Sequence, residues 1–202
     1  MGERIIQRGA EAVLIKKDSF LIKRRLKKSY RFPELDEKMR KQRTKREFNL
    51  LEKASKIIPI PKIFTMDEKA KEITMEFIDG QKLSESLDFM KEKLEISKRI
   101  GINLAKLHDH DIIHGDLTTS NMVLKGSKLY FIDFGLGFTS KRAEDKAVDL
   151  HLIREALEAK HFNIAKQCFE KILEGYEMSK CCKEVVQRLK KVESRGRYKP
   201  QY

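Results

Sequence analysis

The chain has 202 residues, 40% of them hydrophobic and 37% charged, and its net charge is +13. This length suits one large domain or two small lobes. The sequence holds no apolar run of about 18 residues and no charged leader with a cleavage site, so we expect no membrane span, no secretion and a cytoplasmic location.

The first 79 residues predict a small lobe built from a sheet and one helix. Two β-rich runs flank the turn signal Lys17-Asp18-Ser19, as in a hairpin. Pro59 and Pro61 exclude a helix from the segment around them. The expected elements are strands near 11–16 and 20–25, a helix over 36–54, an extended segment over 57–67 and a strand over 72–80.

The second half of the chain predicts a mostly helical lobe. Residues 94–108 carry an apolar stripe with helical spacing, formed by Ile96, Ile100, Leu104 and Leu107. We also expect a short helix over 83–90 with Ser84 or a neighbour as its cap, a tight hairpin around Gly126-Ser127, and helices near 145–159, 162–175 and 180–192.

These elements together predict the α+β class. We expect lobes over 1–79 and 80–193 and a basic tail over 194–202, whose few apolar residues give it little to pack with. Ligands often bind in a cleft between two lobes.

Three cysteines, Cys168, Cys181 and Cys182, fit neither a disulfide framework nor a C-x-x-C metal site. We expect semi-buried thiols in a reducing compartment.

The positive charge is concentrated in one stretch. From Lys23 to Arg46 there are twelve Lys or Arg residues against three acids, which is nine of the thirteen net charges. Such a stretch suits a polyanionic partner such as nucleic acid or an acidic protein. The alternative is a solvated, charge-rich helix of a heat-adapted protein.

The segment "HGDLTTSNMVLKGSKLYFIDFG" carries the chemistry. Asp116 lies on a loop after a helix, Asn121 begins the predicted hairpin, and Asp133 ends it. A hairpin returns its ends to neighbouring positions, so Asn121 and Asp133 can reach one ion. Mg²⁺ prefers such oxygen ligands, and Asp116 is then a candidate base. The alternative for Asp133 is an ordinary turn after a buried strand.

Phosphoryl transfer also needs a cation on the phosphates and an acid that holds it. Lys23 lies on the strand "FLIKRR", and Glu47 lies on the charged helix, from which it can reach that strand. Each residue alone is weak evidence, because a lysine on a strand is often simply solvated.

The motifs "HGDLTTSN" and "IDFG" resemble the catalytic and metal-binding loops of the eukaryotic-like protein kinase superfamily. Further segments resemble one branch of it, the small atypical kinase and ATPase subunit of the KEOPS complex (PRPK type), related to Rio kinases. These segments are "QRGAEA", "IKRRLKKSYRFPELD", "RTKRE", "EDKAVDL" and "SRGR". The resemblance covers essentially the whole chain.

The resemblance implies a minimal two-lobed kinase-like fold that uses ATP with Mg²⁺, or with Mn²⁺ in its place. Asp116 would be catalytic, Asn121 and Asp133 would bind the metal, and Glu47 would hold Lys23 on the phosphates. Further implied residues are Gly9 in the phosphate loop, Met75, Glu76 and Ile78 around adenine, and His114 and Asp149 as structural supports.

The sequence also departs from the kinase pattern. Only Gly9 stands where kinases have three glycines, and Gly115 replaces the Arg that reads activation-loop phosphorylation. Thr118 stands where Ser/Thr kinases usually have Lys. Only nine residues, 136–144, separate Gly135 from Asp145, and no A-P-E motif follows. These departures favour ATP binding over phosphorylation of a free protein substrate. Gly9 can also be a simple β-bulge.

The resemblance implies three partners: a threonylcarbamoyl transferase subunit on the helical lobe and tail, a small KEOPS subunit on the first lobe, and tRNA. We expect an ATPase, or a Ser/Thr kinase that also phosphorylates itself, in threonylcarbamoyl-adenosine formation. The candidate tRNA and partner contacts are Arg40, Lys41, Arg43, Arg195, Arg197 and Lys199.

Other interpretations remain open. A small-molecule phosphotransferase shares the H-G-D motif, although the basic chain argues against a cationic acceptor. A tRNA-binding scaffold with a vestigial kinase site is the third, although the full set of site residues argues against decay. His108, His110 and His114 do not have the spacing of common zinc sites.

Overall fold

The computed structural model describes residues 2–196, with side chains up to residue 194. It divides into two compact units. Unit 1 comprises residues 1–56 and 60–79, and unit 2 comprises 57–59 and the chain from Gly80 onward.

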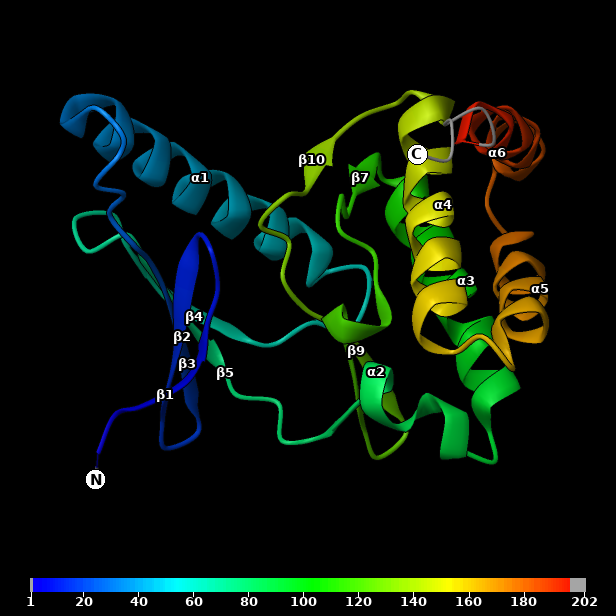
Figure 1. Ribbon diagram of the computed structural model, residues 1–202, viewed down its shortest axis with the longest axis horizontal. Helices are drawn as coiled ribbons and strands as arrows, with labels where there is room; N and C mark the ends of the chain where they lie inside the picture. The colour runs from blue at the N-terminus through cyan, green and yellow to red at the C-terminus, as the bar shows by residue number, and fades with distance from the viewer. Residues whose placement is uncertain (1, 197–202) are drawn as a thin grey trace, which may run out of the picture. The chain divides into compact units, whose positions relative to one another are not determined.

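Unit 1 is built on an antiparallel five-stranded sheet in the order β1-β2-β3-β5-β4 (Figure 1). Along β2 and β3 buried side chains alternate with half-buried ones, as expected for strands with one face on the core. The predicted hairpin is confirmed, and Leu14 lies opposite Lys23. The strands are β1 (Arg4–Arg8), β2 (Ala12–Lys17), β3 (Phe20–Arg25), β4 (Ile63–Asp67) and β5 (Glu72–Glu76).

The helix α1 (Pro33–Ala54) packs beside the sheet, against β4 and β5 (Figure 1). It begins three residues earlier than predicted, because Pro33 occupies the first turn, where its missing N–H costs nothing. Its first turn holds Glu34 and Asp36, which suit the positive end of the helix dipole. Leu50 and Leu51 are buried in the core of unit 1.

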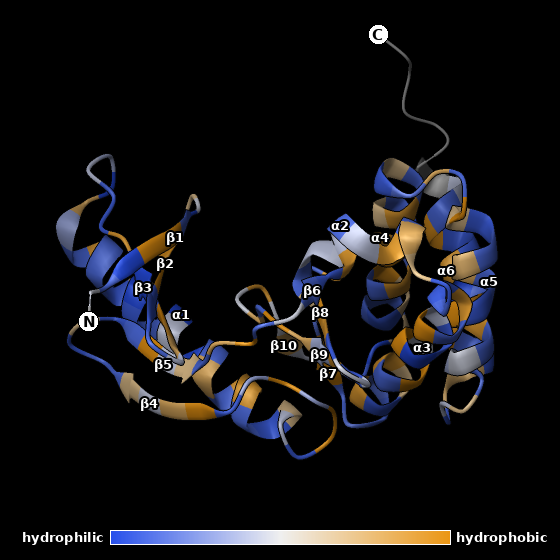
Figure 2. Cartoon of the chain, turned by 90° about the horizontal axis from the view of Figure 1, so that it is seen from below, coloured by the Kyte–Doolittle hydropathy of each residue, from blue (hydrophilic) through white to orange (hydrophobic). Residues whose placement is uncertain are grey.

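Unit 2 has four main helices, of which α3 packs on α5 and α4 packs on α6 (Figure 1). All four residues of the predicted apolar stripe on α3 are buried. Figure 2 shows hydrophobic and hydrophilic residues on the same helices, as expected for amphipathic helices. The helices are α3 (Lys93–Asp109), α4 (Ala143–Lys160), α5 (Ala165–Tyr176) and α6 (Cys182–Gly196).

Unit 2 also contains short strands and short helical turns. A three-stranded sheet has the order β6-β8-β9, and β10 pairs with β7. The predicted hairpin is confirmed, with Met122 opposite Phe131. The elements are β6 (Gln81–Lys82), α2 (Leu83–Ser86), the 3₁₀ turn η1 (Leu87–Phe89), β7 (Ile112–Ile113), the 3₁₀ turn η2 (Thr119–Asn121), β8 (Met122–Lys125), β9 (Lys128–Phe131) and β10 (Phe138–Thr139).

The α+β kinase-like class is confirmed, but several local expectations were wrong. Strand β1 was not predicted, because all five of its residues are exposed and lack the alternation of a half-buried strand. The short helix predicted over 83–90 is instead α2 followed by η1. The N-cap of α2 is Lys82, not Ser84. Helix α6 extends to Gly196, into the region expected to be an unstructured tail.

Candidate functional site

The loop between α3 and β8 is held by a buried carboxylate. Asp149 on α4 is fully buried. Its Oδ2 accepts a hydrogen bond from the backbone N–H of His114 at 2.6 Å, and its Oδ1 accepts one from Gly115 at 2.8 Å. The imidazole Nε2 of His108 lies 3.3 Å from Oδ2, and its Nδ1 lies 2.8 Å from the Tyr176 hydroxyl. Three polar groups thus compensate the buried charge.

The backbone at Gly115 leaves no room for a side chain. Its φ is +77°, and an added Cβ would lie 2.5 Å from the carbonyl oxygen of Leu136. The arginine that many kinases have at this position therefore does not fit this loop.

Asp116 and Asn121 are hydrogen bonded directly to each other. The Nδ2 of Asn121 donates to the Asp116 backbone carbonyl at 2.8 Å and to its carboxylate Oδ2 at 2.9 Å. Because the amide nitrogen faces Asp116, the amide oxygen of Asn121 is the atom that remains to ligate a cation.

Asp133 follows the hairpin in a left-handed conformation, with φ of 61°. The backbone N–H of Ile132 donates to the carbonyl of Asn121 at 3.0 Å, so the two hairpin ends are adjacent, as predicted. The Asp133 Oδ1 accepts from the N–H of Gly135 at 3.1 Å. Asn121 itself ends the turn η2 and does not belong to the strand.

His114 packs beneath this turn, as predicted. Its ring centroid lies 4.5 Å from that of Phe134. Burial lowers its pKa below the usual 6.5, although the nearby Asp149 acts in the opposite direction. The neutral ring fits its contacts: Nε2–H donates to the Ile132 carbonyl at 3.2 Å, and Nδ1 accepts from the Asp116 N–H at 3.4 Å.

In unit 1, Lys23 and Glu47 form the predicted ion pair. The Lys23 Nζ lies 2.6 Å from Glu47 Oε1, and their side chains are 9% and 1% exposed. The other oxygen, Oε2, pairs with Arg25 at 2.5 Å, and the Arg25 side chain is 6% exposed. Sequence reasoning missed Arg25, although its position two residues after Lys23 on a strand places both side chains on one face.

The predicted adenine-binding residues lie at the end of β5. Met75 and Ile78 are buried. The Glu76 N–H donates to the Lys62 carbonyl at 2.7 Å, so this backbone group is already hydrogen bonded. Gly9 lies in the turn between β1 and β2, where its N–H donates to the Ala12 carbonyl at 2.9 Å. The bulge of this strand pair is between Ile5 and Gln7, not at Gly9.

The α1 residues that were predicted to contact nucleic acid form ion pairs with acidic side chains. Arg40 pairs with Asp36 at 2.7 Å and its side chain is 14% exposed. Lys41 pairs with Glu68 at 2.5 Å, and Arg43 pairs with a carboxylate oxygen of Glu11 at 2.7 Å. Burial alone would raise the pKa of Asp36, but the hydrogen bond and charge of Arg40 outweigh it, so this pKa is lowered. The predicted contacts Arg195, Arg197 and Lys199 lie outside the residues with described side chains.

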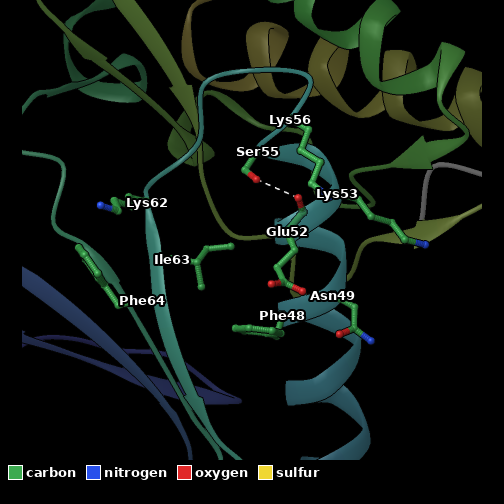
Figure 3. A pocket seen from close by; sticks show the side chains of 9 residues that line it. All are labelled: Phe48, Asn49, Glu52, Lys53, Ser55, Lys56, Lys62, Ile63 and Phe64. Carbon is green, nitrogen blue, oxygen red and sulfur yellow. Dashed lines mark hydrogen bonds between the residues drawn. The ribbon is translucent and has the colours of Figure 1, made fainter.

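A hollow of about 510 Å³ lies between α1 and β4 (Figure 3). Figure 3 shows Phe48 and Ile63 pointing toward one another across it, whereas Lys62 and Phe64 point away. Ser55 and Glu52 also line the hollow, and the Ser55 hydroxyl donates to the Glu52 carbonyl at 2.8 Å. Its lining contains none of the residues predicted to bind ATP, so this hollow is not the predicted nucleotide site.

The three histidines considered for zinc have separate partners. His108 contacts Tyr176 and Asp149, whereas the His110 Nδ1 faces the Lys106 carbonyl at 2.8 Å. Among residues 2–194, no group of three or more His, Cys, Asp or Glu side chains is arranged to hold a metal ion. All three cysteines are free thiols, and burial raises the pKa of Cys168. No helix in the described part of the chain is long and apolar enough to cross a membrane.

Comparison with known proteins identifies relatives over nearly the whole chain. The family model of the RIO domain matches residues 16–154. The "KEOPS complex subunit Bud32" of Pyrococcus abyssi is 38% identical, with 97% of this chain and 96% of that protein covered. The "EKC/KEOPS complex subunit bud32" of Dictyostelium discoideum is 40% identical, over 96% of this chain and 83% of that protein.

A longer kind of relative occurs in methanogens. The "Probable bifunctional tRNA threonylcarbamoyladenosine biosynthesis protein" of Methanocaldococcus jannaschii is 44% identical over 97% of this chain. The chain spans only 37% of that protein's length.

A solved structure shares the fold. The Rio2 kinase of Chaetomium thermophilum, solved as an ADP/Mg²⁺-phosphoaspartate complex, superposes with a TM-score of 0.65 at 14% identity. The match covers 96% of this chain and 71% of that chain. On the combined evidence of motif, fold and relatives, this chain belongs to the kinase-like RIO domain family and, within it, to the family of the KEOPS complex subunit Bud32.

Proposed function

We propose that the chain is an ATP- and Mg²⁺-dependent subunit of a KEOPS-type assembly that forms threonylcarbamoyladenosine on tRNA. Its activity is ATP hydrolysis or the phosphorylation of Ser and Thr residues, including residues of its own chain. The names of its relatives support the assembly and the tRNA modification. The ADP and Mg²⁺ of the Rio2 kinase complex support the cofactors.

The observation that carries the proposal is the contact between Asn121 and Asp116. It turns the amide oxygen of Asn121 away from Asp116 and fixes the Asp116 carboxylate. The hydrogen bond from the Ile132 N–H to the Asn121 carbonyl keeps the two ends of the hairpin together, and Asp133 directly follows Ile132. Carboxylate and amide oxygens are hard ligands that suit Mg²⁺, and Mn²⁺ can replace it.

In the proposed reaction, Asn121 and Asp133 would hold the metal, which would neutralise phosphate charge. The γ-phosphoryl group of ATP passes to the attacking oxygen, and ADP leaves. Asp116 orients the attacking hydroxyl or water and accepts its proton. Lys23 neutralises phosphate charge, and Glu47 keeps its ammonium in place.

The bifunctional relatives support a partner enzyme. This chain matches about a third of such a protein, so the remaining two thirds are available to carry a second activity. We infer a separate threonylcarbamoyl transferase subunit that docks on unit 2 and the tail, and a small KEOPS subunit that docks on unit 1. The assembly then acts in the cytoplasm.

The test is the rate of ATP turnover with Mg²⁺, measured alone, then with the candidate transferase, then with tRNA. We expect stimulation by the transferase or tRNA, and loss of turnover in Asp116→Asn and Asp133→Asn. Asp18→Asn is the matched control, because Asp18 is exposed and shares the positive φ of Asp133. Turnover that persists in both site variants contradicts the assigned roles.

Two additional measurements distinguish the proposed function from its two rivals. Phosphate transfer to small alcohols favours a small-molecule phosphotransferase. Equal tRNA binding with and without ATP, together with no hydrolysis, favours a tRNA-binding scaffold.

A further inference from the structure

A second polar chain, buried at His161 and Thr119 and half-buried at Asp88, reaches the catalytic loop from the other end of α4. His161 follows the last residue of that helix and is 1% exposed. Its Nδ1 lies 2.5 Å from Oδ2 of Asp88, which belongs to η1. Its Nε2 lies 3.1 Å from the hydroxyl of Thr119, the first residue of η2, which is 2% exposed.

The chemistry of the three groups fixes the orientation of the ring. A carboxylate only accepts hydrogen bonds, so Nδ1 of His161 carries a proton and donates to Asp88. The Thr119 hydroxyl both donates and accepts, and therefore pairs with Nε2 whether or not that atom is protonated. Each ring nitrogen of His161 thus has one hydrogen-bond partner.

The backbone of His161 is also anchored. Its N–H donates to the Leu157 carbonyl at 2.7 Å, and its carbonyl accepts from the N–H of Ile164 at 2.9 Å. The ring therefore projects from a rigid helix end, and it can impose a position on Thr119.

Thr119 occupies a position that matters for the site. It lies between Asp116 and Asn121, and η2, which it begins, ends at Asn121. The Asn121 N–H closes this turn by donating to the Thr118 carbonyl at 3.1 Å. A displacement of Thr119 would move Asn121 and its contact with Asp116.

We propose that His161 and Asp88 are positioning residues for the catalytic loop, which act through the hydroxyl of Thr119 on the metal-binding side chain of Asn121. Asp149 holds the beginning of the loop at His114 and Gly115, and His161 holds its end. The helix α4 and the residue that caps it thus fix both ends of the loop. The inference rests on the proposed function for the role of Asn121.

The competing explanation is that Asp88 and Thr119 only satisfy the two ring nitrogens of the buried His161. A purely structural role would lower stability and leave the metal dependence of the folded enzyme unchanged. The dependence of turnover on Mg²⁺ concentration separates the two explanations.

The test compares Thr119→Val, which removes the hydroxyl at nearly constant volume, with Thr119→Ser, which keeps it. We expect Thr119→Val to lower kcat by about ten- to hundredfold, because small misplacements of site groups have effects of that size. We expect the Mg²⁺ concentration for half-maximal turnover to rise several-fold, with KM for ATP changed less. Thr119→Ser restores most of both values.

His161→Ala should reproduce the Thr119→Val effect, and the double variant should be little worse than either single one, because the residues act in one chain. His151→Ala is the control, since this histidine lies on α4, the helix that His161 caps, and pairs with Glu155. Unchanged kcat and Mg²⁺ dependence in Thr119→Val, measured below its melting temperature, overturn the proposal.

Hydrogen exchange provides a readout that does not need activity. Backbone amides of residues 117–122 should exchange faster in Thr119→Val and His161→Ala than in the wild type and His151→Ala. Unchanged exchange overturns the positioning role even if the wild type proves inactive. Wild-type inactivity combined with faster exchange contradicts the proposed function alone.

Discussion

At the scale of single residues, Glu47 binds two cations at once. Lys23 and Arg25 each approach one of its oxygens, and all three side chains are nearly excluded from solvent. A buried charge that loses its partner is left uncompensated, which is far more costly than the loss of an exposed ion pair.

We therefore predict that Glu47→Gln lowers the free energy of unfolding by about 3–5 kcal/mol, as found when buried pairs are broken. Urea denaturation measures the change. Glu52→Gln on the same helix is the control, because its exposed side chain should alter stability by less than about 0.5 kcal/mol. A cost for Glu47→Gln as small as that of the control contradicts the importance of the buried pair.

The pKa of His114 leads to a prediction of pH dependence. Burial lowers the pKa of this histidine in the folded state below the usual 6.5, so the unfolded chain binds its proton more readily. Where the unfolded state binds more protons, stability rises with pH. The contribution is therefore fully present above pH 6.5 and is lost as the pH falls toward the lower, folded-state pKa.

Denaturation curves recorded between about pH 7.5 and pH 5.5 test this, since the unperturbed pKa lies within that interval. His114→Gln, which does not titrate there, should show a shallower fall in stability than the wild type. Parallel pH profiles of the two proteins would contradict the assignment.

At the scale of elements, the contact of α3 with α5 depends on two glycines that face one another. A Cβ added at Gly101 would lie 1.9 Å from the Ile172 carbonyl oxygen, and one added at Gly175 would lie 2.0 Å from that of Lys98. Backbone atoms cannot move aside as a flexible side chain can, so both positions require the close approach of the two helices.

Gly101→Ala and Gly175→Ala should each destabilise the protein by about 3 kcal/mol or more, at the upper end of the range for overpacked sites. Alanine normally favours a helix, so the sign of the effect distinguishes packing from propensity. Lys106→Ala, at an exposed position of α3, should stay within about 0.5 kcal/mol. Thermal melting distinguishes these outcomes, and a stabilised Gly101→Ala would contradict the close contact.

Local patterns predicted the elements that carry the candidate site, because the relevant signals lie close together in the sequence. The apolar stripe of α3 and the turn of the hairpin after Asn121 each lie within one short segment. Strand β1 escaped prediction because its exposed residues show no such period.

Long-range contacts could not be predicted in the same way. Thr119 and His161 are 42 residues apart, and Asp88 and His161 are 73 apart. Nothing near any of these residues indicates its partner. The support from Asp149 was expected only through the resemblance to kinases, and the structure supplies its bonds to the loop backbone.

Across the chain, the net charge of +13 is not equally available to a polyanion. Arg40, Lys41 and Arg43 are paired with acids, so binding phosphate there must compete with a carboxylate. Four other cations of α1 are exposed, and three of them, Lys38, Lys45 and Arg46, belong to the basic stretch that ends at Arg46. We expect these to contribute more to tRNA binding than Arg40 does.

The variant Lys38→Ala/Lys45→Ala/Arg46→Ala should therefore weaken tRNA binding and flatten its dependence on salt. Each cation that neutralises a phosphate contributes a slope of about −0.7 to −0.9 to the plot of log K against log salt. The slope of the triple variant should be smaller in magnitude by about two to three units if all three cations contact phosphates, because three such contributions are removed. Arg40→Ala, whose partner acids remain, is the comparison and should change the slope little. Filter binding across a salt series measures both, and ATP turnover in the absence of tRNA should be the same in each variant as in the wild type. An unchanged slope in the triple variant would show that α1 does not contact the RNA backbone.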